Sequence, residues 1–293
     1  MNHKAGFVNI IGNPNVGKST LMNALVGEKL SIVTAKAQTT RQRVMGIVNG
    51  DDFQIVYSDT PGILKPHYKL QNSMVGVIKN ALSDADIILY VTDMVETIDK
   101  HSEYLEKLAN IDVPVILAIN KVDLADQDKV FLAINTWKEI LPKAEIFAIS
   151  ALKGFNLDGF LNRIVEILPE SEPYFPKDEL TDRSERFFAS EIIREKILLN
   201  YKQEIPYSCD VVIEAFKDEE KIIRIQAVII TEKESQKGIV IGKKGEALKR
   251  TATESRLELE KFFDKKVFLE VFVKVEKNWR ESDLMLKTLG YQP

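Results

Sequence analysis

The chain has 293 residues, enough for one large domain or two ordinary ones with a substantial core. Its 45% hydrophobic and 29% charged residues are typical of a soluble globular protein, and its net charge of −4 excludes a globally basic nucleic-acid binder. Any contact with RNA or DNA must therefore rest on a local basic patch.

Cys209 is the only cysteine, which excludes an intrachain disulfide and favours a reducing compartment. A small apolar role within a strand is its simplest interpretation. The N-terminal stretch "MNHKAGFVNIIGNP" leads almost directly into a predicted strand and leaves no room for a signal or transit peptide. No apolar run approaches the ~20 residues needed to span a bilayer. We therefore expect a cytoplasmic protein.

Short apolar runs alternate with segments of helical periodicity from residue 7 to about residue 168. The alternation predicts an α/β fold with an open, mostly parallel sheet covered by helices on both faces, in a first domain of residues 1–170. The predicted strands are residues 7–12, 53–60, 86–93, 114–121 and 144–150. The predicted helices are residues 18–27, 101–110, 129–141 and 156–169.

A proline-rich, mostly acidic stretch, "PESEPYFPKDELTDR", separates this pattern from a different one. It predicts a linker at residues 171–182 and a smaller α+β domain at residues 183–293. The predicted order in the second domain is helix, strand, strand, helix, glycine-lysine loop, helix, strand and a short last helix. Its clearest elements are residues 185–201, 207–218, 221–232, 246–263, 265–277 and 282–290.

The segment "GNPNVGKST" follows the first predicted strand and opens the first predicted helix. It fits the pattern G-x-x-x-x-G-K-[ST], in which backbone N–H groups turn inward around phosphates and the helix N-terminus adds positive potential. Lys18 is expected to reach the β- and γ-phosphates, and the Ser19 hydroxyl to bind Mg²⁺. The predicted phosphate-binding residues are Gly12, Asn13, Pro14, Asn15, Val16, Gly17, Lys18, Ser19 and Thr20.

The segment "NKVD", at the end of the predicted strand 114–121, selects the base. The Asp123 carboxylate can accept bonds from the ring N1 and the 2-amino group of guanine, donors that adenine lacks, and such sites discriminate by roughly 10⁴–10⁵. Asn120 would tie the base pocket to the phosphate loop, and Ser150 and Ala151 would offer backbone N–H groups to the guanine oxygen. The predicted ligands are GTP and GDP, and the predicted base-binding residues are Asn120, Lys121, Val122, Asp123, Ser150, Ala151 and Leu152.

The segments "AQTTRQR" and "DTPG" supply the remaining predicted contacts. Asp59 would hold Mg²⁺ through water, and the Gly62 N–H would contact the γ-phosphate. Thr39 or Thr40, of which we favour Thr40, would join Mg²⁺ only when a γ-phosphate is present and would order its segment in that state. This group comprises Thr40, Asp59, Thr60, Pro61, Gly62 and Ile63, with Lys18, Thr40 and Gly62 as catalytic groups and Ser19, Thr40 and Asp59 as metal ligands.

Ile63 stands where a Ras-type enzyme has the glutamine that orients the attacking water. Isoleucine cannot orient water, so we expect slow unaided hydrolysis and a switch rather than a fast enzyme. Asn15 is a candidate ligand for a monovalent cation, K⁺, that would supply the missing positive charge.

The stretch "GIVIGKKGEALK" is one residue short of a second phosphate loop, and Lys244 stands where a hydroxyl must meet the metal. We predict instead a G-x-x-G turn whose lysines meet phosphates while about four nucleotides lie across an apolar groove, as in KH modules. Residues 237–280 hold 12 basic and 7 acidic residues, a net charge of +5. The alternative is a solvated turn between helices. The predicted RNA-binding residues are Ile239, Val240, Ile241, Gly242, Lys243, Lys244, Gly245, Lys249 and Arg250.

Trp279 lies beyond this turn and has two interpretations. It could stack on a base or pack beneath the last helix, and we favour packing.

Both predicted domains, in this order, resemble the Era family of bacterial GTPases. The resemblance covers nearly the whole chain and rests on "GNPNVGKS", "AQTTR", "DTPG", "NKVD", "SALKG", "GIVIGKKGEALK", "VKVEKNWR" and "LGY". It implies a P-loop GTPase domain followed by a type II KH domain that holds the 3′ end of 16S ribosomal RNA in the GTP-bound state, during maturation of the small ribosomal subunit. It also implies peripheral contact with the inner face of the cell membrane. We expect a monomer.

Two other functions stay open at this point. A metabolic P-loop kinase would transfer a phosphoryl group to a small molecule, but it would leave "NKVD" unexplained and need not reject ATP. A structural RNA-binding protein with a vestigial nucleotide domain would not be expected to keep all the phosphate, metal and base ligands.

Overall fold

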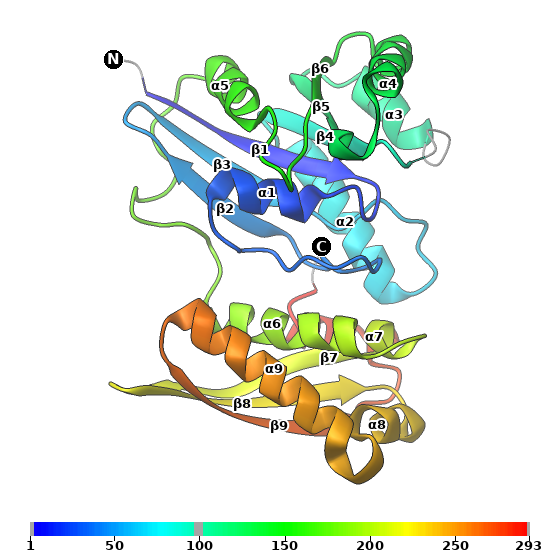
Figure 1. The fold of residues 1–293 in the computed structure, drawn as a ribbon, viewed down its shortest axis with the longest axis vertical. Helices are drawn as coiled ribbons and strands as arrows, with labels where there is room; N and C mark the ends of the chain where they lie inside the picture. The colour runs from blue at the N-terminus through cyan, green and yellow to red at the C-terminus, as the bar shows by residue number, and fades with distance from the viewer. Residues whose placement is uncertain (1–2, 97–101, 292–293) are drawn as a thin grey trace.

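The computed structural model describes residues 3–96 and 102–291 of the chain. These residues form two separate β-sheets, one in the N-terminal and one in the C-terminal part (Figure 1). The N-terminal sheet has the strand order β2-β3-β1-β4-β5-β6, in which only β2 is antiparallel to its neighbour. The strands are β1 Lys4–Gly12, β2 Val44–Asn49, β3 Phe53–Asp59, β4 Ile87–Asp93, β5 Val115–Asn120 and β6 Glu145–Ala148. The predicted mostly parallel sheet is therefore confirmed.

Helices cover both faces of this sheet. The helices α1 (Lys18–Val26) and α5 (Leu157–Ile167) pack into one buried apolar cluster, on one face. The other three, α2 (Lys69–Ser83), α3 (Ser102–Ala109) and α4 (Gln127–Ile140), pack into a second cluster, on the opposite face. Residue 101, where the predicted helix 101–110 was expected to begin, lies outside the described residues.

Two elements of the N-terminal part were not predicted, strand β2 and helix α2. The strand is a short edge strand interrupted by Gly46, so its apolar run is weak. The helix carries Leu70, Met74, Ile78 and Ala81 on its buried side, which is a regular helical spacing. The sequence therefore does carry a helical signal for α2.

The parallel strands bring three predicted site segments to one edge of the sheet. Strand β1 ends at Gly12, β3 at Asp59 and β5 at Asn120. Because parallel strands have their carboxyl ends on the same side, side chains that follow them converge there, as in other open α/β sheets.

The connection between the two parts is formed by residues 169–184 and contains one isolated β-bridge, between Lys4 and Glu170. This connection runs beside strand β2 and is hydrogen-bonded to it. The Ile47 N–H donates to the Leu180 carbonyl at 2.8 Å, and the Thr181 hydroxyl donates to the Met45 carbonyl at 2.7 Å. The predicted linker is therefore held against the edge of the first sheet, and its predicted limits stay a prediction.

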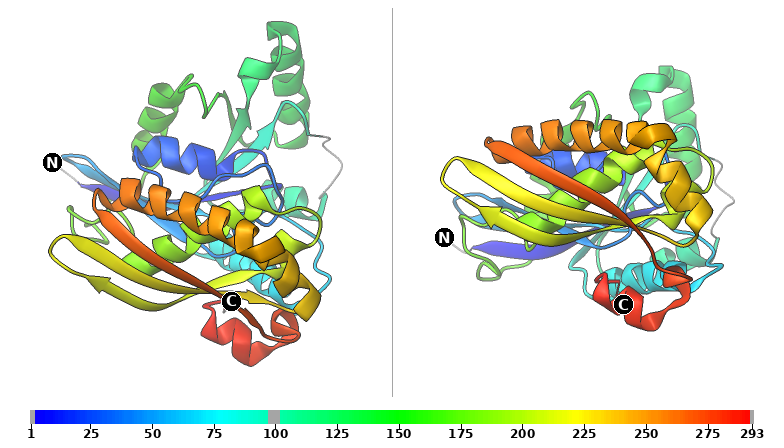
Figure 2. Two further views of the ribbon diagram at one scale, coloured as in Figure 1. Left: turned by 60° about the horizontal axis from the view of Figure 1, so that its bottom comes forward. Right: turned by 90° about the horizontal axis from the view of Figure 1, so that it is seen from below.

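The C-terminal sheet has the order β7-β8-β9, with β7 antiparallel and β9 parallel to β8. Helices α6, α8 and α9 pack on one face of it around a buried apolar cluster, as Figure 2 also shows. The elements are α6 Glu185–Asn200, α7 Ile205–Ser208, β7 Asp210–Asp218, β8 Ile222–Thr231, α8 Glu234–Ile241, α9 Glu246–Phe263, β9 Lys266–Val275 and α10 Asp283–Thr288.

Trp279 packs against the opposite face of this sheet, on the side where α10 also lies (Figure 2). Its side chain is 0% exposed, packs with Val228 and Leu286, and donates its indole N–H to the Ser208 carbonyl at 3.0 Å. The same cluster includes Leu70 of α2, so it joins the two parts of the chain. The packing interpretation of Trp279 is confirmed.

Cys209 is also buried, and burial raises the pKa of its thiol to about 12. It therefore behaves as the small apolar residue that was expected. Among the helices that the structure describes, none combines the length and hydrophobicity that a bilayer-spanning segment needs.

The cluster around Trp279 yields a stability prediction. Trp279→Ala should lower the free energy of unfolding by about 3–5 kcal/mol, because it removes a buried aromatic side chain and leaves a cavity. Phe272→Ala, which truncates an exposed aromatic side chain on β9, should cost about 1 kcal/mol or less. Urea denaturation followed by circular dichroism measures both. Equal losses in the two variants would contradict this packing.

Candidate functional site

The loop between β1 and α1 contains two positions whose backbone conformation requires glycine. Gly12 and Gly17 have φ angles of 149° and 97°. A Cβ at Gly12 would lie 2.1 Å from the Val91 carbonyl oxygen, and one at Gly17 would lie 2.3 Å from the Asn120 amide nitrogen. The loop thus turns tightly between neighbouring strands and enters α1 directly, which directs free N–H groups at its centre.

Lys18 lies inside this loop and is only 6% exposed. Its ammonium group donates to the carbonyls of Gly12, at 3.1 Å, and Asn13, at 2.7 Å. Burial lowers the pKa of Lys18 to about 8, although the negative charges of Asp59 and Glu96 act in the other direction. An anionic ligand in the loop would stabilise this buried cation.

The three predicted metal ligands lie together beside Lys18. The Ser19 hydroxyl donates to Asp59 Oδ2 at 2.6 Å, and the Thr40 hydroxyl lies 3.0 Å from Ser19 Oγ and 3.1 Å from Asp59 Oδ2. Burial raises the pKa of the Asp59 carboxyl, while Lys18 and the hydroxyls of Ser19, Ser31 and Thr40 oppose that rise.

This donor set fits a hard divalent cation such as Mg²⁺. Hydroxyl and carboxylate oxygens are its preferred protein ligands, and Mg²⁺ usually takes few of them and keeps water and phosphate oxygens. The buried Asp59 Oδ1 has no hydrogen-bond partner among the described residues, so it has an oxygen to offer to a metal-bound water. The residues that the structure describes contain no cluster of three acidic, histidine or cysteine side chains that would hold a metal ion without other ligands.

Thr39 points elsewhere than Thr40. Its hydroxyl lies 2.7 Å from the Thr34 hydroxyl and donates to the Lys36 carbonyl at 2.6 Å. The geometry therefore favours Thr40, as the sequence did.

The segment after β3 approaches the phosphate loop closely. A Cβ at Gly62 would lie 2.7 Å from the Pro14 backbone, so glycine is needed there. Ile63 is buried in the apolar cluster beneath α2–α4, and its N–H donates to the Gly12 carbonyl at 3.1 Å. The buried Thr60 hydroxyl donates to the Ile10 carbonyl at 2.7 Å. The side chains of Thr60 and Ile63 are thus buried beside the phosphate loop, which the Ile63 N–H contacts through Gly12.

Asn120 links three segments of the predicted base pocket. Its amide nitrogen donates to the Val16 carbonyl at 2.9 Å, and its amide oxygen accepts from the Ala151 N–H at 2.9 Å. The Lys121 ammonium donates to the Asn15 carbonyl at 2.6 Å and pairs with Asp93 at 2.5 Å. A cavity of about 560 Å³, lined in part by Asp123 and Ser150, opens beside this residue group.

Two backbone groups of the base pocket are already engaged. The Ser150 N–H donates to the Phe155 carbonyl at 3.2 Å, and the Ala151 N–H donates to Asn120. If either N–H group also donated to a guanine oxygen, its hydrogen would be shared between two acceptors. The sequence alone does not reveal these existing hydrogen bonds. The Leu152 side chain is 76% exposed.

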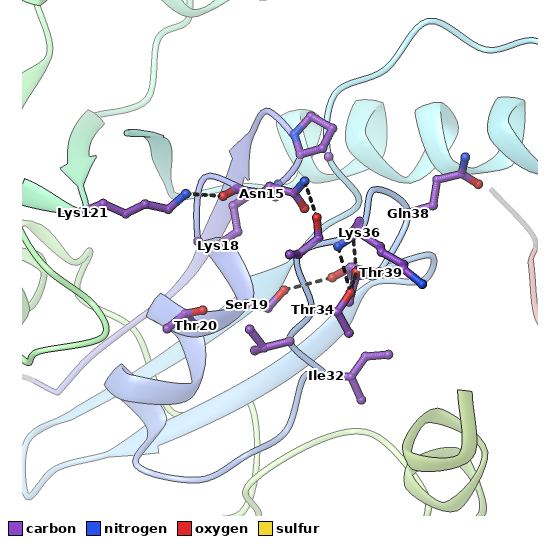
Figure 3. A pocket seen from close by; sticks show the side chains of 16 residues that line it. Asn15, Lys18, Ser19, Thr20, Ile32, Thr34, Lys36, Gln38, Thr39 and Lys121 are labelled. Atoms are coloured by element: carbon purple, nitrogen blue, oxygen red, sulfur yellow. Dashed lines mark hydrogen bonds between the residues drawn. The ribbon is translucent and has the colours of Figure 1, made fainter. Parts of the chain in front are cut away.

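A cavity of about 250 Å³ lies between the phosphate loop and residues 32–40, as Figure 3 shows. Its walls carry Lys18, Ser19 and Thr40 as well as the Gly62 backbone. The Asn15 side chain closes one side by donating to the Ala35 carbonyl at 3.0 Å. Sixteen residues line it, and nine of the predicted site residues are among them: Pro14, Asn15, Gly17, Lys18, Ser19, Thr20, Thr40, Gly62 and Lys121.

The segment 36–41, which we call the threonine segment, is also held by the C-terminal part of the chain. The Lys36 ammonium donates to the carbonyls of Leu198, in the last turn of α6, and of Tyr201, the residue that follows this helix. The buried Arg194 guanidinium of α6 donates to the Thr39 carbonyl.

On the other side of Thr40, the buried Arg41 guanidinium reaches the same part of the chain. It donates to the carbonyls of Cys209, at 2.9 Å, and Pro206, at 3.2 Å, and pairs with Asp210 at 3.3 Å. Sequence reasoning missed Lys36, Arg41 and Arg194. For Arg41, the available signal was the basic character of "AQTTRQR".

The second glycine-lysine loop is a tight turn between α8 and α9. Gly242 has a φ angle of 73°, and a Cβ there would lie 2.6 Å from the Ala247 side chain, so glycine is required. Lys243 and Lys244 are exposed on the turn, and Lys249 and Arg250 are exposed on the first turns of α9. The four cations therefore face solvent near one helix N-terminus.

One part of the predicted groove is wrong. Val240 is 0% exposed and belongs to the buried cluster beneath α6 and α9, so its side chain cannot form the floor of a groove. The reason is the helical period of α8, which turns Val240 inward while Ile239, at 52% exposed, faces out. Ile241 is half-buried.

Comparisons with known proteins agree with both halves of this geometry. The family model "50S ribosome-binding GTPase" matches residues 7–121, and the model "KH domain" matches residues 204–280. The chain is 48% identical to GTPase Era of Clostridium kluyveri over 291 residues, which cover 99% of each chain. It is 43% identical to GTPase Era of Staphylococcus haemolyticus over 291 residues, which cover 99% of this chain and 97% of that one.

Solved structures are similar over the same length. A crystal structure of Era in complex with MgGDPNP and nucleotides 1506–1542 of 16S ribosomal RNA has a TM-score of 0.94 and 40% identity, with 99% of this chain and 100% of that chain covered. A variant of Aquifex aeolicus Era bound to GDP·AlF4⁻ has the same TM-score, identity and coverage. With both domains matched and the similarity extending over its whole length, the chain belongs to the Era family of GTPases.

Proposed function

We propose that this chain binds GTP and GDP with Mg²⁺, hydrolyses GTP slowly, and in its GTP-bound state holds the 3′ end of 16S ribosomal RNA in its KH domain to assist maturation of the small ribosomal subunit. One observation carries the proposal. The threonine segment contacts both the nucleotide cavity, through Thr40, and the C-terminal part of the chain, through Lys36, the Thr39 carbonyl and Arg41. The solved Era structure that contains a GTP analogue also contains 16S ribosomal RNA, which supports the RNA assignment.

The chemistry at the nucleotide end follows from the residues around Lys18. Lys18 would balance the charge of the β- and γ-phosphates, and the free N–H groups of the loop would hold their oxygens. Ser19, Thr40 and a water on Asp59 would hold Mg²⁺, which would supply neutralising charge at the phosphates. The Gly62 N–H would bind the γ-phosphate. Since the Ile63 side chain is buried, no side chain at that position orients water, and unaided hydrolysis should be slow.

The KH end would bind single-stranded RNA by its exposed cations. Lys243 and Lys244 lie on the turn, where they would meet backbone phosphates, and Lys249 and Arg250 extend the basic surface along α9. Exposed Ile239 and half-buried Ile241 are the apolar surface that remains for the bases.

Coupling between the two ends would run through the threonine segment. With a γ-phosphate bound, the Thr40 hydroxyl would be a ligand of Mg²⁺, so GTP would stabilise the backbone of residues 39–41 more than GDP would. Because the Thr39 carbonyl and the Arg41 side chain bind the KH domain, the same ordering fixes the KH domain relative to the nucleotide site.

Three expectations remain predictions. The first is a K⁺ ion near Asn15, and the second is a monomeric state. The third is a cytoplasmic location with peripheral contact at the inner face of the cell membrane. For the K⁺ ion, Asn15 faces the carbonyl of Ala35, which lines the same cavity.

Base selection by Asp123 gives the first functional prediction. Asp123→Asn should weaken GDP binding by roughly 10–100-fold, because hydrogen bonds to a charged group contribute about 1.5–3 kcal/mol each. The same change should favour xanthosine diphosphate, whose carbonyl oxygen can accept from the new amide. Competition against a fluorescent nucleotide measures both affinities. The control is Asp126→Asn, which makes the same charge change at the N-cap of α4 and preserves the cap. Unchanged GDP affinity in Asp123→Asn would refute the assignment.

RNA binding by the second loop gives the next prediction, and it tests the proposed function as a whole. The probe is a labelled oligonucleotide copying the 3′ end of 16S ribosomal RNA, added with a non-hydrolysable GTP analogue and then with GDP. Wild-type protein should bind more tightly with the analogue. The double variant Lys243→Asp, Lys244→Asp should lose roughly tenfold or more, because it reverses two phosphate-facing charges.

The matched control for this experiment is Lys217→Asp, Lys221→Asp. It changes two exposed lysines by the same charge around the β7–β8 turn, at the other end of the sheet from α8 (Figure 1). Binding should be nearly unchanged in that control. Equal losses in both double variants would mean that the oligonucleotide responds to net charge and not to the turn.

Coupling through Arg194 is tested separately. Arg194→Gln removes a cation that holds the threonine segment, so the ratio of RNA affinities in the GTP-analogue and GDP states should fall towards one. Arg186→Gln, an exposed arginine on the same helix, should keep the wild-type ratio. A wild-type ratio in Arg194→Gln would show that coupling takes another route.

A further inference from the structure

The first turn of helix α2 is joined to the C-terminal part of the chain. Its first N–H, that of Lys69, donates to the Glu281 carboxylate at 3.3 Å, so a side chain from the other part of the chain satisfies this helix end. Leu70 and Trp279 belong to the same buried cluster. Both views in Figure 2 show α2 beside the C-terminal segment. The start of α2 is therefore held against residues 279–281.

Tyr68, immediately before α2, connects two segments that line the phosphate site. Its hydroxyl donates to Gln38 Oε1 at 2.8 Å, and Gln38 belongs to the threonine segment. On the N-terminal side, only residues 63–67, which form neither helix nor strand, separate Tyr68 from Gly62. Tyr68 is thus linked to both groups that would respond to a γ-phosphate, the Thr40 hydroxyl and the Gly62 N–H.

The Tyr68 ring lies against a guanidinium group of the C-terminal part. The central carbon of the Arg280 guanidinium is 4.7 Å from the ring centroid, a distance typical of a cation–π contact. The same guanidinium pairs with the mostly buried carboxylate of Glu232 and donates to the Tyr207 carbonyl at 3.5 Å. Arg280 therefore joins Tyr68 to the KH domain.

Glu232 in turn belongs to the entry of helix α8. Its N–H donates at 3.0 Å to the side chain of Gln236, in the first turn of that helix. The helix ends at Ile241, and Gly242 then opens the second glycine-lysine loop. An eight-residue helix is about 12 Å long and moves as one rigid element. Arg280 thus holds α8 at the end opposite to the loop that would bind RNA.

We propose that the contact between Tyr68 and Arg280 couples the γ-phosphate of GTP to the RNA-binding loop, by a route distinct from the contacts of Arg41 and Arg194. This coupling rests on the proposed function and is a further step in its regulation. With a γ-phosphate bound, Gly62 and the threonine segment are both fixed, and they hold the Tyr68 ring on the guanidinium, which orients α8. With GDP, neither segment is fixed in this way, and the ring contact is weaker.

The first test is the ratio of affinities for the 16S 3′-end oligonucleotide with a non-hydrolysable GTP analogue and with GDP. In Tyr68→Leu the ratio should fall roughly 3- to 10-fold towards one, since the cation–π contact is lost. Tyr68→Phe keeps the ring and should retain the greater part of the ratio. The control is Tyr174→Leu, which removes a tyrosine that packs on the Phe7 ring and should keep the wild-type ratio. A wild-type ratio in Tyr68→Leu would overturn the proposal.

The route through Arg280 is tested by the double variant Tyr68→Leu, Glu232→Gln. Glu232→Gln alone should lower the affinity ratio, because it weakens the pair that joins the guanidinium to α8. If the two residues act in one route, the double variant should have the same ratio as Tyr68→Leu. Losses that multiply would show that the two residues act independently, which contradicts this route.

Hydrogen exchange of the full chain without RNA gives a second measurement. Amides of residues 232–245 should exchange more slowly with the GTP analogue than with GDP in wild type, and this difference should disappear in Tyr68→Leu. A purely structural role for Tyr68 would change exchange equally in both nucleotide states. If the oligonucleotide does not bind but the exchange difference is present, the proposed RNA function fails and the coupling stands. If RNA affinity depends on the nucleotide but exchange at residues 232–245 does not, the RNA function stands and this coupling is refuted.

Discussion

The buried guanidinium of Arg41 is the contact on which the arrangement of the two domains depends. It donates to backbone carbonyls at the start of the KH sheet and pairs with Asp210, whose carboxylate also accepts from the Tyr291 hydroxyl at 2.5 Å. A charge buried in this way is tolerable only with all its partners in place, and removing one partner usually costs far more than a surface pair would. The GTPase domain thus reaches into the KH domain from the residue next to Thr40.

That adjacency gives the nucleotide a physical path to the RNA-binding domain. A ligand shifts a conformational equilibrium only by the difference between its affinities for the two states. GTP and GDP differ at the γ-phosphate, and the Thr40 hydroxyl, 3.0 Å from Ser19 Oγ, is the group of the threonine segment placed to respond to that difference. The backbone on either side of Thr40 is held by Arg194 and by the Arg41 contacts. Movement of the segment and movement of the KH domain are therefore expected to occur together.

Local sequence patterns predicted residues that the structure brings together around the phosphate loop, because the geometry of that loop is set by local constraints. Gly12 and Gly17 occupy backbone conformations that other residues rarely adopt, and parallel strands bring their ends to one edge. The domain contacts were not predictable in this way. Arg41 and its KH-domain partners are more than 160 residues apart, and nothing local distinguishes it from a solvated arginine. The groove was misjudged at Val240 because the run "IVI" was treated as one surface, although a helix alternates its faces.

The most direct test of this account uses the reciprocity of coupled binding. If GTP strengthens RNA binding through the threonine segment, RNA must strengthen GTP binding by the same factor. The measurement is the affinity of the full chain for a non-hydrolysable GTP analogue and for GDP, each by calorimetry with and without a saturating 16S 3′-end oligonucleotide. The account predicts that the oligonucleotide raises the preference for the analogue over GDP. An unchanged preference, with the oligonucleotide bound in both states, would contradict it.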